Sequence, residues 1–151
     1  MNTFTLLKPE LQRSIERSGY RTPNAVQSRV IPLLLAGHNL FVQSKTGSGK
    51  TLAYLLPMIQ NIETDNRNIQ ALILAPTREL ALQTTEALET LAGPKSKVHM
   101  VTVYGGSSYG PQLRALREGA QVVVGTPGRI MDLIDKGALD LTSVNTVVLD
   151  E

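Results

Sequence analysis

Apolar residues fall into short continuous runs along the chain, and these runs alternate with longer stretches of helical periodicity. The runs cover residues 40–42, 71–75, 98–103, 122–124 and 147–149. The helical stretches cover residues 9–18, a segment beginning near 23, and 50–62, 78–91, 111–118 and 130–136. Continuous rather than alternating apolar runs are typical of parallel strands buried on both faces. The pattern predicts an α/β fold with a doubly wound, mostly parallel sheet.

Local signals support this division into elements. Pro9 stands at a first-turn position and Gly19 just past the end of the first helical stretch, which is where helices favour these residues. Right-handed crossovers place every strand-to-helix turn at one edge of such a sheet. We therefore expect motifs located at these turns to converge.

Composition changes this picture little. The chain has 151 residues, 42% of them hydrophobic and 19% charged, which is typical of one soluble globular domain. It has no cysteine, so we expect no disulfide or thiolate metal site and a cytoplasmic location. The longest apolar run, 30–36, contains Pro32 and is far shorter than the ~20 residues of a membrane-spanning helix. A net charge of +2 only slightly favours a nucleic-acid partner.

Residues 44–51, Ser-Lys-Thr-Gly-Ser-Gly-Lys-Thr, lie between an apolar run and a helical stretch. There, backbone N–H groups and a helix N-terminus can surround a polyphosphate, while Lys50 neutralises it and Thr51 offers a hydroxyl to Mg²⁺. The alternative is a glycine-rich turn without a ligand, and Ser44 departs from the glycine of the generic pattern. The residues expected to bind the nucleotide here are Thr46, Gly47, Ser48, Gly49, Lys50 and Thr51.

Two acids follow the last apolar run. Phosphate-loop enzymes place a Mg²⁺ ligand beside a water-activating base at such a strand end. Asp150 is the candidate metal ligand, acting through water, and Glu151 the candidate for polarising the attacking water. With Lys50, these acids form the expected catalytic set. The alternative is an ordinary polar strand end.

Six blocks together resemble the DEAD-box family of ATP-dependent RNA helicases, and they occur in that family's order. They are residues 19–27, 44–51, 76–83, 105–106, 126–129 and 148–151. The resemblance implies a RecA-like phosphate-loop domain that binds ATP and Mg²⁺. It also implies that ATP hydrolysis is coupled to unwinding or remodelling of RNA duplexes.

The first block resembles the family's adenine-reading motif. By this resemblance the carboxamide of Gln27 would satisfy a donor and an acceptor on the adenine edge, since it carries both functions. Tyr20 replaces the usual phenylalanine and would pack against the base, and Asn24 stands where threonine is common. Phe4 is the candidate for the family's isolated upstream aromatic. Without the other blocks, Gln27 would be interpreted as an ordinary exposed helix residue.

Three further blocks resemble those with which the family grips the backbone of one RNA strand. Threonines at helix starts, arginines and a glycine pair are suited to phosphate contacts. Such contacts carry no base identity, so binding should tolerate any sequence and weaken as salt rises. Taken alone, residues 126–129 are simply a turn followed by a helix. The candidate RNA-binding residues are Pro76, Thr77, Arg78, Gly105, Gly106, Thr126, Gly128 and Arg129.

The resemblance also sets expectations about domain organisation. Residues 1–36 would form N-terminal helices with the adenine motif, and residues 37–151 a partial ATP-binding domain, with the second helicase domain absent. In the family, another strand lies between the phosphate-loop strand and the Asp-Glu strand. Without it we expect apolar sheet edges, and self-association or strand swapping.

The activity expected of the chain alone is correspondingly limited. It should bind nucleotide and RNA weakly without unwinding duplexes, because the arginines that complete the family's ATP site lie in the second domain. Two alternatives are a non-catalytic nucleotide- or RNA-binding fragment and a phosphate-loop ATPase that acts on something other than RNA.

Overall fold

The computed structural model describes residues 2–151, which form two compact units. The first unit comprises the residues up to Asn61 together with Ala87–Lys95, and the second comprises Ile62–Glu86 and Ser96–Glu151. Among the described residues, no helix has both the length and the apolar character required to cross a bilayer.

The first unit is helical. A 3₁₀ helix, η1 (Thr3–Leu6), precedes α1 (Pro9–Arg17), α2 (Ala25–Leu35) and α3 (Lys50–Asn61). Pro9 occupies the first turn of α1, as its sequence position predicts. The core of the unit is aliphatic, because the amphipathic helices bury one face each. Its largest fully buried side chains are Ile15, Ile31, Leu55, Leu56 and Leu88.

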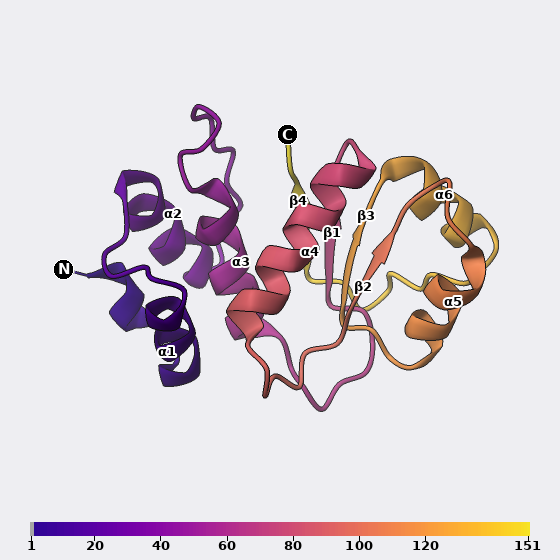
Figure 1. Ribbon diagram of the computed structural model, residues 1–151, viewed down its shortest axis with the longest axis horizontal. Coiled ribbons are helices and arrows are strands. Elements are labelled where there is room, and N and C mark those ends of the chain that lie inside the picture. Colours follow the sequence, from indigo (N-terminus) through magenta and orange to yellow (C-terminus); the bar gives the residue numbers. More distant parts are fainter. Residues whose placement is uncertain (1) are drawn as a thin grey trace. The chain divides into compact units, whose positions relative to one another are not determined.

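The second unit contains a four-stranded, fully parallel sheet of strand order β2-β3-β1-β4 (Figure 1). This confirms the predicted doubly wound α/β fold. Each apolar run after residue 70 contains a strand, since parallel strands must be apolar on both faces. The strands are β1 (Ala71–Leu74), β2 (Met100–Val103), β3 (Val122–Gly125) and β4 (Thr146–Leu149). The helices are α4 (Arg78–Ala92), which belongs to the first unit from Ala87 on, α5 (Tyr109–Arg117) and α6 (Pro127–Asp135).

Helices lie on both faces of this sheet. Val101 and Val103 of β2 belong to a buried cluster with Leu133 of α6 and with residues of α5 packed against it. Thr102 points to the opposite face, where its hydroxyl lies 2.6 Å from that of Thr85 in α4. The alternation of side chains along β2 therefore separates α4 from α5 and α6.

Two buried glutamines fix the amino ends of the strands. Gln121, which is fully buried, donates from Nε2 to the carbonyls of Glu63, Thr64 and Asn66 and accepts from the backbone N–H of His99. Gln70 bonds the same loop through Glu63 and Asn66. The loop before β1 is thus fastened to the sheet at the end opposite the predicted motifs.

The strand predicted at residues 40–42 is not formed, and this prediction was wrong. These residues pair with no described strand, and the side chain of Phe41 is 95% exposed. A parallel strand needs a ladder partner to satisfy its backbone groups, so apolar composition alone does not produce one. β4 pairs only with β1, and its Val147 and Leu149 are 59% and 75% exposed. β4 is therefore an apolar edge strand.

The sheet packs closely against α6 at Gly125. A Cβ at this position would lie 2.6 Å from Val103 Cγ2, 2.7 Å from the Val103 carbonyl oxygen and 2.8 Å from Ile130 Cδ1. We expect Gly125→Ala to lower the free energy of unfolding by about 1–3 kcal/mol, measured by urea denaturation, because backbone must shift to admit the methyl group. Gly128→Ala is the control: its Cβ meets nothing within 4 Å. Equal stability of the two variants would contradict the expectation.

Candidate functional site

The predicted phosphate loop leads directly into a helix, as the sequence indicates. Lys50 is the first residue of α3, and the preceding turn contains Gly47 and Gly49 at φ +80° and +85°. These left-handed conformations favour glycine because a side chain would be strained there. The turn therefore ends at a helix N-terminus, where unpaired N–H groups suit an anion.

The ammonium of Lys50 is bound by its own loop. It donates to the Ser44 carbonyl at 2.6 Å, to Ser44 Oγ at 3.2 Å and to the Lys45 carbonyl at 3.1 Å. Ser44 Oγ also lies 2.6 Å from Ser48 Oγ. Ser44, the departure from the generic glycine pattern, therefore closes the loop around the lysine. A polyphosphate would have to replace these oxygens to reach Lys50.

The candidate adenine motif is hydrogen-bonded to the phosphate loop. Asn24 caps α2, where its Oδ1 accepts from Gln27 N–H while Gln27 Oε1 accepts from Asn24 N–H, a reciprocal capping box. Asn24 Nδ2 then donates to the Ser48 carbonyl at 2.9 Å, and Gln27 Nε2 to the Gly49 carbonyl at 3.4 Å. Two motifs separated in sequence thus form one structure.

Gly49 lies where these amides approach most closely. A Cβ on Gly49 would lie 2.5 Å from Asn24 Nδ2 and 2.7 Å from Gln27 Nε2. Glycine is needed here both for its positive φ and for this contact. Gln27 is only 4% exposed, and both functions of its amide are engaged within the unit. Its reading of adenine stays a prediction, and the structure adds a role in supporting the phosphate loop.

The two candidate aromatics of this region differ in exposure. Tyr20 is 43% exposed, so its ring is accessible to a ligand. Phe4 is 5% exposed and lies within η1, in the interior of the first unit. The packing of Tyr20 against a base stays a prediction, whereas Phe4 is a core residue in this structure.

In the second unit, the candidate RNA-binding blocks follow the carboxyl ends of β1, β2 and β3. Because these strands are parallel, the blocks meet at one edge of the sheet, as predicted. Thr77 Oγ1 accepts from Leu80 N–H and so caps α4. Arg78 Cζ lies 4.7 Å from the centroid of the Tyr104 ring, a cation–π contact between the block after β1 and the residue that precedes Gly105.

Arg129 is only 9% exposed and is engaged within the second unit. Its NH1 donates to Gln112 Oε1 at 3.0 Å, its NH2 donates to the Ser107 carbonyl at 3.1 Å, and its Cζ lies 4.0 Å over the Tyr109 ring. Direct contact of Arg129 with phosphate stays a prediction. The roles of Gln112, Ser107 and Tyr109 were not predicted, because no local pattern marks a glutamine, serine or tyrosine as a partner of a distant arginine.

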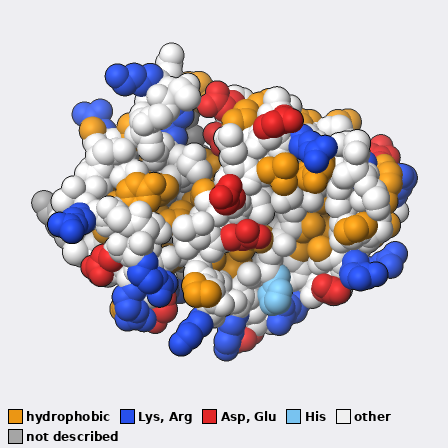
Figure 2. Space-filling model, in the orientation of Figure 1, with side chains coloured by type: hydrophobic (Ala, Val, Ile, Leu, Met, Phe, Trp, Pro, Cys, Tyr) orange, Lys and Arg blue, Asp and Glu red, His pale blue; other side chains and the backbone are white. Residues whose placement is uncertain are grey.

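The remaining candidates are accessible or lie at helix starts. Thr126 precedes α6 in an extended conformation, with Pro127 in the first turn, but its side chain makes no capping hydrogen bond. Asp150 and Glu151 follow β4, where Asp150 N–H donates to the Leu74 carbonyl. The catalytic roles of these acids stay predictions. On the face shown in Figure 2, Lys and Arg side chains are interspersed with Asp and Glu, so no single basic patch marks an interface there.

Asn24 provides a test of the capping box and its connection to the phosphate loop. We expect Asn24→Ala to lower the free energy of unfolding by about 1–2 kcal/mol, because it removes the α2 cap and the bond to the Ser48 carbonyl. Asn24→Asp retains the cap and should lose less. Urea denaturation followed by far-ultraviolet circular dichroism measures both. An unchanged midpoint for Asn24→Ala would show that the cap contributes nothing.

Comparison with known proteins connects these features. The sequence profile of the DEAD/DEAH box helicase family matches residues 24–151. The ATP-dependent RNA helicase DeaD of Mycobacterium tuberculosis (strain CDC 1551 / Oshkosh) is 46% identical over 145 residues, covering 96% of this chain and 26% of that protein. The protein of the same name from Escherichia coli (strain K12) is 45% identical over 145 residues, covering 96% and 23%.

The fold agrees with this similarity. The crystal structure of a DEAD box protein from the hyperthermophile Methanococcus jannaschii matches with a TM-score of 0.91 and 41% identity, covering 96% of this chain and 39% of that one. The RecA-like architecture expected from the sequence is thereby confirmed. The chain spans about a quarter of the length of the curated relatives it matches. Sequence, motif order and fold lead to one conclusion: the chain belongs to the DEAD/DEAH box helicase family.

Proposed function

We propose that this chain supplies the ATP-binding and RNA-gripping part of an ATP-dependent RNA helicase of the cytoplasm, where ATP and RNA are both available. One observation carries the proposal: the adenine motif and the phosphate loop are joined by the hydrogen bonds of Asn24 and Gln27 to the loop carbonyls. These bonds hold the two motifs together, as a site that contacts both the base and the phosphates of one nucleotide requires. The relatives named ATP-dependent RNA helicase support the choice of activity.

In this proposal the nucleotide replaces the partners that Lys50 now has. Its β and γ phosphates take the ammonium from the Ser44 and Lys45 oxygens, and backbone N–H groups of residues 46–49 surround them. The Gln27 carboxamide keeps its bonds to Asn24 N–H and to the Gly49 carbonyl and offers its second N–H and second oxygen lone pair to the adenine edge. The exposed ring of Tyr20 packs against the base.

The residues present fit a magnesium ion that is bound mainly through phosphate and water. The described part of the chain contains no cluster of three His, Cys, Asp or Glu residues that could hold a metal alone. Mg²⁺ in nucleotide sites needs only one or two protein oxygens. Two candidates are of a suitable type: Thr51 carries a hydroxyl at the start of α3, and Asp150 carries a carboxylate after β4. When bound, the ion neutralises charge that develops on the phosphates. Glu151 would hold the attacking water and accept its proton.

The RNA strand would lie along the carboxyl edge of the sheet. Arg78 supplies charge, and the Gly105–Gly106 turn and the capped start of α4 supply backbone N–H groups. These groups contact phosphate and ribose, so affinity depends on salt more than on base sequence.

The effect of Lys50 on Mg-ATP affinity distinguishes a nucleotide site from a glycine-rich turn without a ligand. We expect the chain to bind Mg-ATP in isothermal titration calorimetry, and Lys50→Ala to weaken binding at least about tenfold, since it removes a charge-assisted contact to phosphate. Lys45→Ala is a matched control, because Lys45 is an exposed neighbour of the same charge. A flat trace for the folded parent chain, or equal losses for the two variants, would contradict the proposal.

Hydrolysis is a separate expectation. We expect the chain by itself to bind ATP without appreciable turnover. In the family, arginines of the second domain stabilise the transition state, a contribution on the order of a thousandfold in related phosphoryl transfers. Release of phosphate from ATP, measured with and without single-stranded RNA, tests this. RNA-stimulated release that disappears in Lys50→Ala would prove the expectation wrong.

A further inference from the structure

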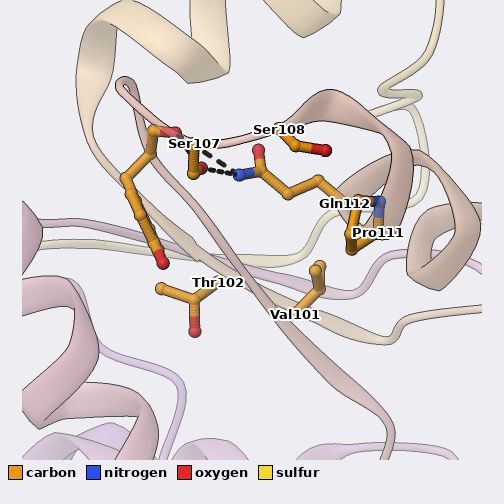
Figure 3. Close-up of a pocket in the computed structure, with 7 residues that line it drawn as sticks. Val101, Thr102, Ser107, Ser108, Pro111 and Gln112 are labelled. Carbon is orange, nitrogen blue, oxygen red and sulfur yellow. Dashed lines mark hydrogen bonds between the residues drawn. The ribbon is translucent and has the colours of Figure 1, made fainter.

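The Gly105–Gly106 turn is open on the side to which a side chain would project. Gly106 has φ +78°, and a Cβ on either glycine would meet nothing within 4 Å. Next to the turn is an open pocket of about 240 Å³ (Figure 3). Its lining consists of Val101, Thr102, Tyr104, Ser107, Ser108, Pro111 and Gln112. The side-chain hydrogen bonds at the two ends of the turn are therefore the interactions expected to hold its conformation.

Gln112 of α5 makes most of these bonds. Its side chain points from the helix toward the turn, where Nε2 donates to Ser107 Oγ at 2.6 Å and to the Tyr104 carbonyl at 3.4 Å (Figure 3). Ser107 Oγ in turn donates to the same carbonyl at 3.0 Å. Tyr104 and Ser107 flank the glycine pair, so one carboxamide holds both ends of the turn.

The other half of this carboxamide faces Arg129. Gln112 Oε1 accepts from Arg129 NH1, while Arg129 NH2 donates to the Ser107 carbonyl. The guanidinium is also fixed against the Tyr109 ring, which Lys136 Nζ contacts at 3.9 Å. Gln112 is 6% exposed and therefore largely inaccessible to a ligand. Gln112 therefore connects Arg129 to the turn by hydrogen bonds.

We propose that Gln112 is a positioning residue for RNA binding: by donating to Ser107 and Tyr104 and accepting from Arg129, it holds the Gly105–Gly106 turn in the form that presents backbone N–H groups to a phosphate. The inference rests on the RNA-gripping function proposed above. A carboxamide is required because a carboxylate has no donor and an ammonium no acceptor. Gln112 touches no RNA and acts through the turn.

The test uses the chain and a fluorescently labelled uridine oligonucleotide, with anisotropy measured over a range of salt concentrations. Gln112→Met removes both amide functions at similar volume, and Ser107→Ala removes only the hydroxyl between Gln112 and Tyr104. Gln43→Met, at an exposed site outside the binding blocks, is the matched control. Arg78→Ala removes a cation that we place on phosphate.

We expect Gln112→Met to weaken RNA binding about tenfold, the effect of one or two lost hydrogen bonds, with an unchanged salt slope because no cation is removed. Ser107→Ala should weaken binding less, also without a change of slope. Arg78→Ala should lower the slope by about 0.7, the value for one single-strand phosphate contact. Gln43→Met should resemble the parent chain.

A second measurement needs no RNA. In ¹H–¹⁵N spectra, the Gly105 and Gly106 amide signals should shift or broaden in Gln112→Met and Ser107→Ala and remain in place in Gln43→Met. The inference would be overturned if Gln112→Met and Ser107→Ala both bound RNA as tightly as the unsubstituted chain, or if both left the Gly105 and Gly106 signals in place. Either result would leave the proposed function intact. A parent chain that binds no RNA even at low salt would overturn the proposed function, and the inference with it. If Gln112→Met fails to fold, the RNA affinity and the glycine amide signals of Ser107→Ala test the inference.

Discussion

Parallel pairing of four short strands is the constraint on which the candidate RNA site depends. Strands in the order β2-β3-β1-β4 must all end at the same edge, so the segments that follow them are brought together regardless of their separation in sequence. The opposite edge is fixed by Gln70 and Gln121, which bind the loop before β1. Hydrogen bonds therefore hold the end of the sheet where the strands begin, and the end where the strands finish is available for ligands.

Buried carboxamides hold loops in both units, beside the predicted motifs and at the opposite end of the sheet. A carboxamide is neutral and both donates and accepts, so it joins two segments without the cost of burying a charge. Within the described part of the chain, no buried side-chain nitrogen or oxygen lacks a hydrogen-bond partner. Full satisfaction is what allows such polar networks to specify one conformation. The buried carboxamides in question are Gln27, Gln70, Gln112 and Gln121.

The sequence was informative wherever the determinant is local. Apolar runs identified β1 to β4, and Pro9 identified the start of α1, because hydrophobic periodicity and capping act over a few residues. The segment 40–42 was predicted incorrectly because a strand depends on a partner that its own sequence does not contain. The roles of Ser44 and Gln112 were missed for a similar reason. Hydrogen bonds between distant residues follow from the fold and leave no trace in local spacing.

The contacts of Lys50 have a consequence for which anions the loop can accept. Three oxygens of Ser44 and Lys45 surround the ammonium, and all three belong to the loop that leads into α3. A competing anion must match all three at once, which a chain of linked phosphates can do and a lone chloride cannot. An anion with a single acceptor is therefore expected to gain little at Lys50, because it would replace only one of these oxygens.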